Sequence, residues 1–127
     1  MRISDIIINN FRIYRGENHI NFENKPDKNI HLIAGKNGFG KTTFLTTLIW
    51  VLYGKQMSQV EEKYKIDIRH VGGYDKYLTS LLNKDLKREF DSNQIDQAIF
   101  NVELRLKDIL IPSIPCKELI IKRSYNY

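Results

Sequence analysis

The stretch Gly35-Lys36-Asn37-Gly38-Phe39-Gly40-Lys41-Thr42 matches the phosphate-binding pattern G-x-x-x-x-G-K-[ST] at every fixed position. An apolar segment, 30–34, leads directly into it, and a second apolar segment follows. This context predicts a strand that ends in a glycine-rich turn, and a helix whose unpaired first amides point at an anion. The stretch therefore indicates a nucleoside triphosphate site; a glycine-rich turn before an ordinary helix is the alternative.

Each position in this motif has a distinct expected role. Successive backbone amides of 37–43 would form an anion nest, and Gly38 and Gly40 would permit the close approach that a Cβ would block. The Lys41 ammonium, the predicted catalytic cation, would reach the β- and γ-phosphates, while the Thr42 hydroxyl would be one ligand of Mg²⁺. The predicted cofactors are ATP and Mg²⁺. Within the motif, the residues predicted to bind them are Gly35, Lys36, Asn37, Gly38, Phe39, Gly40, Lys41, Thr42 and Thr43.

Length and composition narrow the class of protein. The chain has 127 residues, 42% of them hydrophobic, which is one domain's worth of sequence. It shows neither an apolar run of membrane-spanning length nor a signal peptide, which predicts a cytoplasmic protein without a membrane partner. The single cysteine, Cys116, has no internal disulfide partner and is interpreted as a partly buried structural thiol. The net charge of +5 is compatible with DNA binding, but mixed charges between 55 and 90 favour an ordinary solvated surface.

The first third of the chain predicts a hairpin. Segments 3–8 and 19–22 are rich in strand-forming residues, and the polar run 15–18 between them predicts the turn. A surface loop at 23–29 then leads to the strand at 30–34, on which His31 is interpreted as an ordinary strand residue.

The segment 41–53 predicts a helix that ends at Gly54, where a left-handed residue terminates helices. One stripe is apolar, but Trp50, Val51 and Tyr53 lie elsewhere on the helix, which predicts a central helix buried on several sides. Trp50 and Tyr53 are accordingly interpreted as core residues rather than as a pair that stacks on bases. The stripe consists of Phe44, Leu45, Leu48, Ile49 and Leu52.

The segments after this helix are less regular. Residues 55–73 lack a clear period and are expected to form an irregular, mobile crossing. Apolar residues at three- and four-residue steps over 74–90 predict one amphipathic helix, which packs over the sheet or presents a docking face for a partner or DNA.

The last third predicts strands again. Strict alternation over 100–106 is typical of a half-buried antiparallel strand. Pro112 and Pro115 then indicate a loop, and 118–125 predicts a second strand of a meander.

Several segments together resemble a known family. The run 8–16, the motif within 32–43, and Ile49-Trp50-Val51-Leu52-Tyr53-Gly54 follow each other in the order and spacing of the N-terminal lobe of SMC-like, double-strand-break-repair-type ABC ATPases. Within this class, 74–83 and 120–123 are most similar to the DndD family of DNA sulfur modification proteins. The resemblance implies an α/β fold for residues 1–127: a P-loop NTPase lobe of ABC ATPase type with a mixed sheet, a central P-loop helix and antiparallel strands.

The resemblance also implies a mode of action. Arg12 matches the arginine that lies near the nucleotide or the lobe interface in relatives, and is therefore a candidate ATP-binding residue. Two such heads bind two ATP between them, each completing the site of the other, and their closure changes how the protein holds DNA. The implied partners are a second head in a homodimer, DNA, and other DNA modification or repair subunits.

The 127 residues also depart from the family pattern. They contain no apolar run ending in Asp-Glu, no Leu-Ser-Gly-Gly signature, no heptads and no convincing Q-loop. These elements come later in family order, so the chain is expected to be an N-terminal fragment of a longer coiled-coil ATPase and inactive alone. The alternatives are a stand-alone nucleotide-binding regulatory domain without catalysis and a small P-loop nucleotide kinase, although no arginine-rich lid is recognisable.

Overall fold

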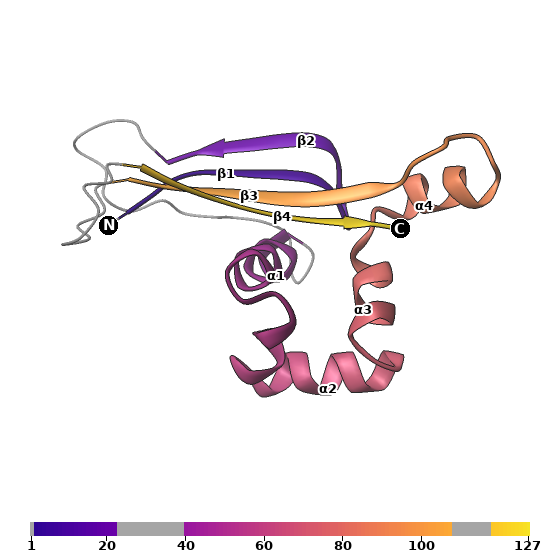
Figure 1. Ribbon diagram of the computed structural model, residues 1–127, viewed down its shortest axis with the longest axis horizontal. Helices are drawn as coiled ribbons and strands as arrows, with labels where there is room; N and C mark the ends of the chain where they lie inside the picture. The colour runs from indigo at the N-terminus through magenta and orange to yellow at the C-terminus, as the bar shows by residue number, and fades with distance from the viewer. Residues whose placement is uncertain (1, 23–39, 108–117) are drawn as a thin grey trace.

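The computed structural model describes residues 2–22, 40–107 and 118–127. They form one four-stranded antiparallel sheet with helices against one face (Figure 1), and the strand order is β2-β1-β3-β4. The strands are β1 (Arg2–Phe11), β2 (Tyr14–Asn21), β3 (Ile99–Lys107) and β4 (Glu118–Asn126). The helices are α1 (Gly40–Tyr53), the 3-10 helix η1 (Gly54–Gln59), α2 (Glu62–Val71), α3 (Tyr74–Leu81) and α4 (Lys84–Asp91).

Some predictions fall on segments that the structure does not describe. They concern His31, Cys116, the loop around Pro112 and Pro115, and the strand at 30–34 that would make the sheet mixed. The part of the sheet that is described is antiparallel throughout.

The predicted hairpin is confirmed, but its turn is not where the polar run lies. The chain reverses at Arg12 and Ile13, so the predicted turn at 15–18 is wrong. Those residues belong to β2, where Gly16 has a φ of 69° and donates its amide hydrogen to Asn10 Oδ1 at 2.8 Å. The register shifts beside this contact, so the glycine and its polar neighbours mark a β-bulge rather than a reversal.

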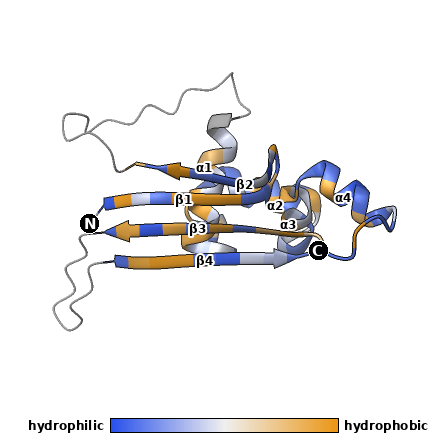
Figure 2. Cartoon of the chain, turned by 90° about the horizontal axis from the view of Figure 1, so that it is seen from above, coloured by the Kyte–Doolittle hydropathy of each residue, from blue (hydrophilic) through white to orange (hydrophobic). Residues whose placement is uncertain are grey.

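Strand β3 is an inner strand of the sheet, and it confirms the predicted half-buried antiparallel strand. It pairs with β1 on one side and with β4 on the other. Figure 2 shows hydrophobic and hydrophilic residues alternating along it. The even-numbered side chains are buried against the helices, as a two-residue period requires, and they are Phe100, Val102, Leu104 and Leu106.

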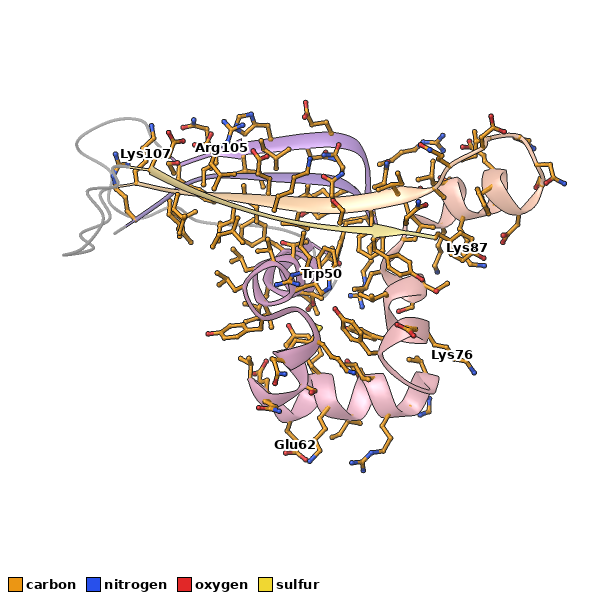
Figure 3. All side chains as sticks on the ribbon, in the orientation of Figure 1. Trp50, Glu62, Lys76, Lys87, Arg105 and Lys107 are labelled. Atoms are coloured by element: carbon orange, nitrogen blue, oxygen red, sulfur yellow. The ribbon has the colours of Figure 1, made fainter. Side chains whose placement is uncertain are left out.

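Helix α1 crosses beneath the strands, as Figures 1 and 2 show together, and its predicted end at Gly54 is confirmed by a φ of 56° there. Trp50 is 1% exposed and points from α1 toward the sheet (Figure 3). Its ring centroid lies 5.1 Å from that of Phe100 and 6.1 Å from that of Phe11, and its Nε1 donates to the Tyr74 hydroxyl at 3.0 Å. Trp50 is thus a core residue whose one polar atom is satisfied.

The prediction that α1 is buried on several sides is wrong. Leu45, Leu52 and Tyr53 are 47%, 43% and 46% exposed, so Tyr53 is not a core residue. The buried face carries threonines instead: Thr46 donates to the Thr42 carbonyl, and Thr47 to the Phe44 carbonyl. Because these hydroxyls are satisfied within their own helix, they are buried without an unpaired polar group.

The segment 55–73 is helical, not irregular as predicted. Helices η1 and α2 occupy most of it, and Met57 and Tyr64 are fully buried. Helix α2 ends at Gly72, whose φ of 102° is left-handed. Its apolar stripe consists mainly of Tyr64 and Ile68, which is too short for the sequence to show a clear period.

The single helix predicted over 74–90 is two helices, separated at Leu82 and Asn83. Leu82 forms an isolated β-bridge with Phe11 instead of continuing α3. The Asn83 side-chain oxygen then accepts hydrogen bonds from the amides of Asp85 and Leu86, each at 3.1 Å, and so caps α4. Helix α3 packs into the core as predicted, whereas α4 has no buried residue.

The break between α3 and α4 is bonded directly to the turn of the hairpin. The Arg12 amide donates to the Leu81 carbonyl at 2.7 Å, and the Asn83 amide donates to the Asn10 carbonyl at 2.8 Å. The Asn83 side-chain NH₂ donates to the Arg12 carbonyl at 2.6 Å. Asn10 and Arg12 both have positive φ, at 56° and 48°, and these hydrogen bonds offset the cost of that backbone conformation.

The face of the sheet away from the helices is polar. Arg105 and Lys107 lie on it (Figure 3), and near them Asp5 Oδ2 lies 2.6 Å from His19 Nε2 and accepts from Asn21 Nδ2 at 3.0 Å. Burial raises the pKa of Asp5, but the hydrogen bonds from His19 and Ser4 outweigh it, so its pKa is lowered overall.

Replacing Asn83 with alanine should destabilise the protein by about 2–4 kcal/mol, because α4 loses its cap and the Arg12 carbonyl loses its donor. Urea unfolding measures this change. Asn83→Ser keeps a capping oxygen but cannot reach Arg12 in the same way, so it should lower the free energy of unfolding by less than Asn83→Ala does. A loss below about 0.5 kcal/mol for Asn83→Ala would contradict the assigned contacts.

Asp5 should stabilise the fold in a pH-dependent way. Because its folded pKa is depressed, its contribution is fully present above the unfolded value, about 3.9, and is lost as the pH falls through the lower folded value. Asp5→Asn should therefore be less stable than wild type at neutral pH, and this difference should disappear toward pH ~2. Urea unfolding across this range measures it, with Glu17→Gln on β2 as the charge-matched control. A gap that stays constant with pH would show that Asp5 does not act through its charge.

Candidate functional site

A cleft of about 670 Å³ lies where the hairpin turn, the start of α1 and the α3–α4 break meet. Its volume is in the range typical of pockets that bind small molecules. Two residues predicted to bind nucleotide, Arg12 and Thr43, come together here from different elements. The residues that line it are Arg12, Ile13, Thr43, Ser80, Leu82, Asn83, Lys84, Asp85 and Arg88.

The start of α1 forms one wall of this cleft. The described helix spans Gly40–Tyr53, which agrees with the helix predicted over 41–53, and Gly40, Lys41, Thr42 and Thr43 are its first described residues. The first amides of an α-helix have no partner within it, and no acidic residue in this turn opposes an anion. The motif residues Gly35, Lys36, Asn37, Gly38 and Phe39 and the side chain of Lys41 lie outside the described part of the chain, so the roles of the motif residues stay predictions.

Arg12 forms a second wall. The contacts of the hairpin turn fix its backbone, and its guanidinium lies near the Tyr77 hydroxyl, which is buried. Burial raises the pKa of Tyr77 to about 12, although the Arg12 charge opposes this rise in part. Tyr77 Oη makes no hydrogen bond of normal geometry within residues 2–22, 40–107 and 118–127. Arg12 therefore adds positive charge beside a buried neutral hydroxyl.

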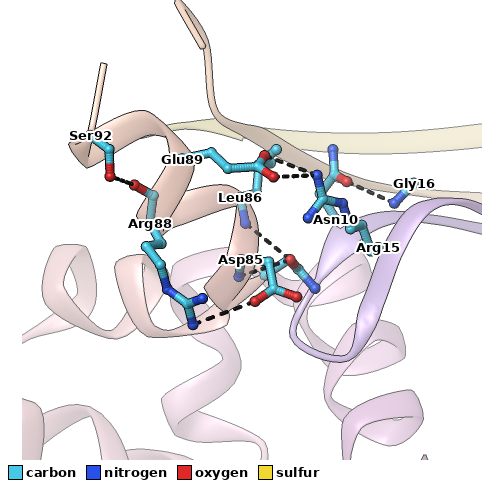
Figure 4. A network of polar contacts seen from close by, with 9 residues as sticks. Asn10, Arg15, Gly16, Asp85, Leu86, Arg88, Glu89 and Ser92 are labelled. Carbon is cyan, nitrogen blue, oxygen red and sulfur yellow. Dashed lines mark hydrogen bonds and ion pairs between the residues drawn. The ribbon is translucent and has the colours of Figure 1, made fainter. Parts of the chain in front are cut away.

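The α3–α4 corner forms the third wall, and it is predominantly basic. Lys84 and Arg88 come from α4, together with one acidic residue, Asp85. Arg88 Nη2 lies 3.5 Å from Asp85 Oδ1 (Figure 4). With Arg12, three cations and one carboxylate line the cleft among the residues that the structure describes, a formal balance of 3 − 1 = +2. Clefts lined by one sign of charge attract ligands of the opposite sign, so this cleft favours anions.

Polar and aromatic contacts hold α4 in place although none of its residues is buried. Arg15 Nη2 donates to both Glu89 carboxylate oxygens, at 2.8 and 2.9 Å, and so ties β2 to α4 (Figure 4). This pairing raises the pKa of Arg15. In the same last turn of α4, the rings of Phe90 and Tyr127 meet with centroids 5.4 Å apart. These contacts hold the end of α4 to the sheet, and the hydrogen bonds of Asn83 hold its start.

Sequence reasoning missed the residues of this corner. The sequence predicts one continuous helix there and no cleft. The residues concerned are Ser80, Asn83, Lys84, Asp85 and Arg88. One signal was present: an asparagine followed by an acidic residue two positions later is typical of a helix N-terminus.

Comparison with known families identifies the class of domain. Residues 5–109 match the family model described as an AAA domain, which covers most of the chain. The chain belongs to this family and is an SMC-like ATPase lobe. No curated protein and no solved structure matches it.

ATPase domains of this kind bind nucleotide, typically with Mg²⁺, and the residues present fit that pair. The described lining of the cleft is positively charged and adjoins the first turn of α1, which suits phosphate. The predicted metal ligand, Thr42, is in the first turn of α1. Residues 2–22, 40–107 and 118–127 contain no cluster of three or more His, Cys, Asp or Glu side chains suited to a metal ion. Among the helices described, none has the length and apolar character needed to cross a membrane.

Proposed function

We propose that this chain is the ATP-binding half of an SMC-like ATPase head that acts in DNA metabolism. The observation that carries the proposal is the cleft, where Arg12 and the first turn of α1 meet in a site of net positive charge. Membership of the AAA domain family supports it independently, because that family consists of nucleotide-binding ATPase domains.

Different residues of the chain would bind different parts of ATP and Mg²⁺. The amides of 37–43 would hold the phosphates, Lys41 would neutralise charge on the β- and γ-phosphates, and Thr42 would be a ligand of Mg²⁺. Arg12, which belongs to the hairpin turn, would lie beside the nucleotide. Mg²⁺ held by Thr42 would supply positive charge that neutralises the phosphates.

Head engagement is the proposed mechanical output. Binding of ATP would bring two heads together as a homodimer of the longer protein, and their closure would change its hold on DNA. The resemblance of 8–16, 32–43 and 49–54 to SMC-like ATPases supports this step. The likeness of 74–83 and 120–123 to the DndD family extends the proposal to DNA phosphorothioation-linked modification or restriction. DNA repair is the wider class of process. The proposed partners are other DNA-modification or repair subunits.

The chain should bind ATP·Mg²⁺, and Lys41→Ala should weaken binding by at least about tenfold, because a charge-assisted phosphate contact is lost. Isothermal titration calorimetry measures this change, with Lys65→Ala on α2, an exposed lysine outside the cleft, as the control. Equal affinity of the Lys41→Ala variant and the wild type would refute the assigned site.

Turnover by these 127 residues alone should be negligible, because phosphoryl transfer also needs a water-orienting group and charge from an opposite head. Release of labelled phosphate measures it. Lys41-dependent turnover within the usual range of enzymes, about 1–1000 s⁻¹, would favour a complete catalytic site over a half-site.

A further inference from the structure

We propose that the α3–α4 corner is part of the nucleotide site: the Lys84 ammonium contacts the phosphate groups of the bound nucleoside triphosphate, and Asn83 fixes Lys84 relative to Arg12. This inference rests on the proposed function. It adds a phosphate-binding residue that lies outside the glycine-rich motif and follows it by a long stretch of chain.

The first observation is the position of Lys84. It lines the same cleft as Arg12 and Thr43, although the three residues belong to different elements. Thr43 is in the first turn of α1, where the motif would place the phosphates. A ligand that extends from this turn into the cleft therefore meets a basic side chain from the hairpin and another from α4.

The second observation is the state of the charges on α4. Lys87 Nζ forms an ion pair with Asp91 at 3.1 Å, and Arg88 forms one with Asp85 at 3.5 Å. Lys84 forms no ion pair within the described part of the chain, and neither does Arg12. Among the described residues that line the cleft, the one carboxylate, Asp85, is paired with Arg88, so the repulsion between the Arg12 and Lys84 cations is best offset by a further anion. A polyphosphate supplies that anion.

The third observation is that the α3–α4 corner is already ordered without a ligand. The Asn83 side chain connects the hairpin turn to α4: it donates to the Arg12 carbonyl and accepts hydrogen bonds from amides in the first turn of α4, which carries Lys84. Asn83 is 6% exposed. The ion pair of Arg15 and Glu89 holds α4 at a second point. A cationic wall that is already in place loses little conformational entropy when it binds.

The chain also supplies a matched control. Lys87 lies one turn along α4 from Lys84 and does not line the cleft; it lines an adjacent hollow of about 360 Å³, which Lys84 also borders. Lys84 and Lys87 therefore share charge, length and helix, but only Lys84 faces the cleft, and Lys87 is paired with Asp91.

The experiment measures the dissociation constants of the whole chain for ATP·Mg²⁺, ADP·Mg²⁺ and adenosine by calorimetry. Lys84→Ala and Lys84→Gln should weaken ATP binding by about threefold to tenfold, as expected for a partly exposed ionic contact. The loss should be smaller for ADP, absent for adenosine, and reduced by added salt, because it depends on phosphate charge. Lys84→Arg should bind nearly as wild type, and Lys87→Ala should change binding by less than about twofold.

Two results would overturn the inference while leaving the proposed function intact: equal effects of Lys84→Ala and Lys87→Ala in a protein that binds ATP through Lys41, or the same loss for adenosine as for ATP. Failure of the wild-type chain to bind ATP would defeat both proposals. The thermal unfolding midpoint of each variant should match that of wild type, so a loss of affinity reports contact with the ligand and not loss of the fold.

Discussion

The side chain of Asn83 forms the contact on which the candidate site depends. It bonds to the carbonyl of Arg12 and to the first amides of α4, so one buried amide group joins a β-turn to a helix start. Without this joint, the basic corner has no defined position relative to the sheet. The cleft is therefore a property of the way in which two distant segments meet, and each segment alone carries only an ordinary turn or helix end.

Patterns that are local in sequence predicted much of the fold. The alternation that forms β3, the apolar segment of α1 and the stop at Gly54 each involve neighbours a few residues apart, and the structure confirms them. The break at Asn83 was missed because apolar residues keep a helical spacing across it. What stops α3 is a bridge from Leu82 to Phe11, and no local pattern contains that partner.

The candidate site also has a part that a local sequence pattern predicts and a part that only the fold brings together. A glycine-rich motif has a fixed spacing, so it could be recognised without the fold, and the structure confirms the helix that was predicted over 41–53. Lys84 has no motif around it and enters the cleft only because the chain folds. The buried face of α1 shows a related limit: hydropathy cannot register that Thr46 and Thr47 satisfy their hydroxyls within the helix.

The pairing of β1 with β3 has a consequence for the order of events during synthesis. Strand β1 leaves the ribosome early, but its neighbour β3 is made only after every helix of the described part of the chain. Contacts so far apart along the chain form slowly, because a long loop must close first. Until β3 emerges, the nascent hairpin has an open edge and no second strand to support its turn. A growing chain therefore completes its ligand-binding architecture late, well after the residues of the motif themselves have been translated.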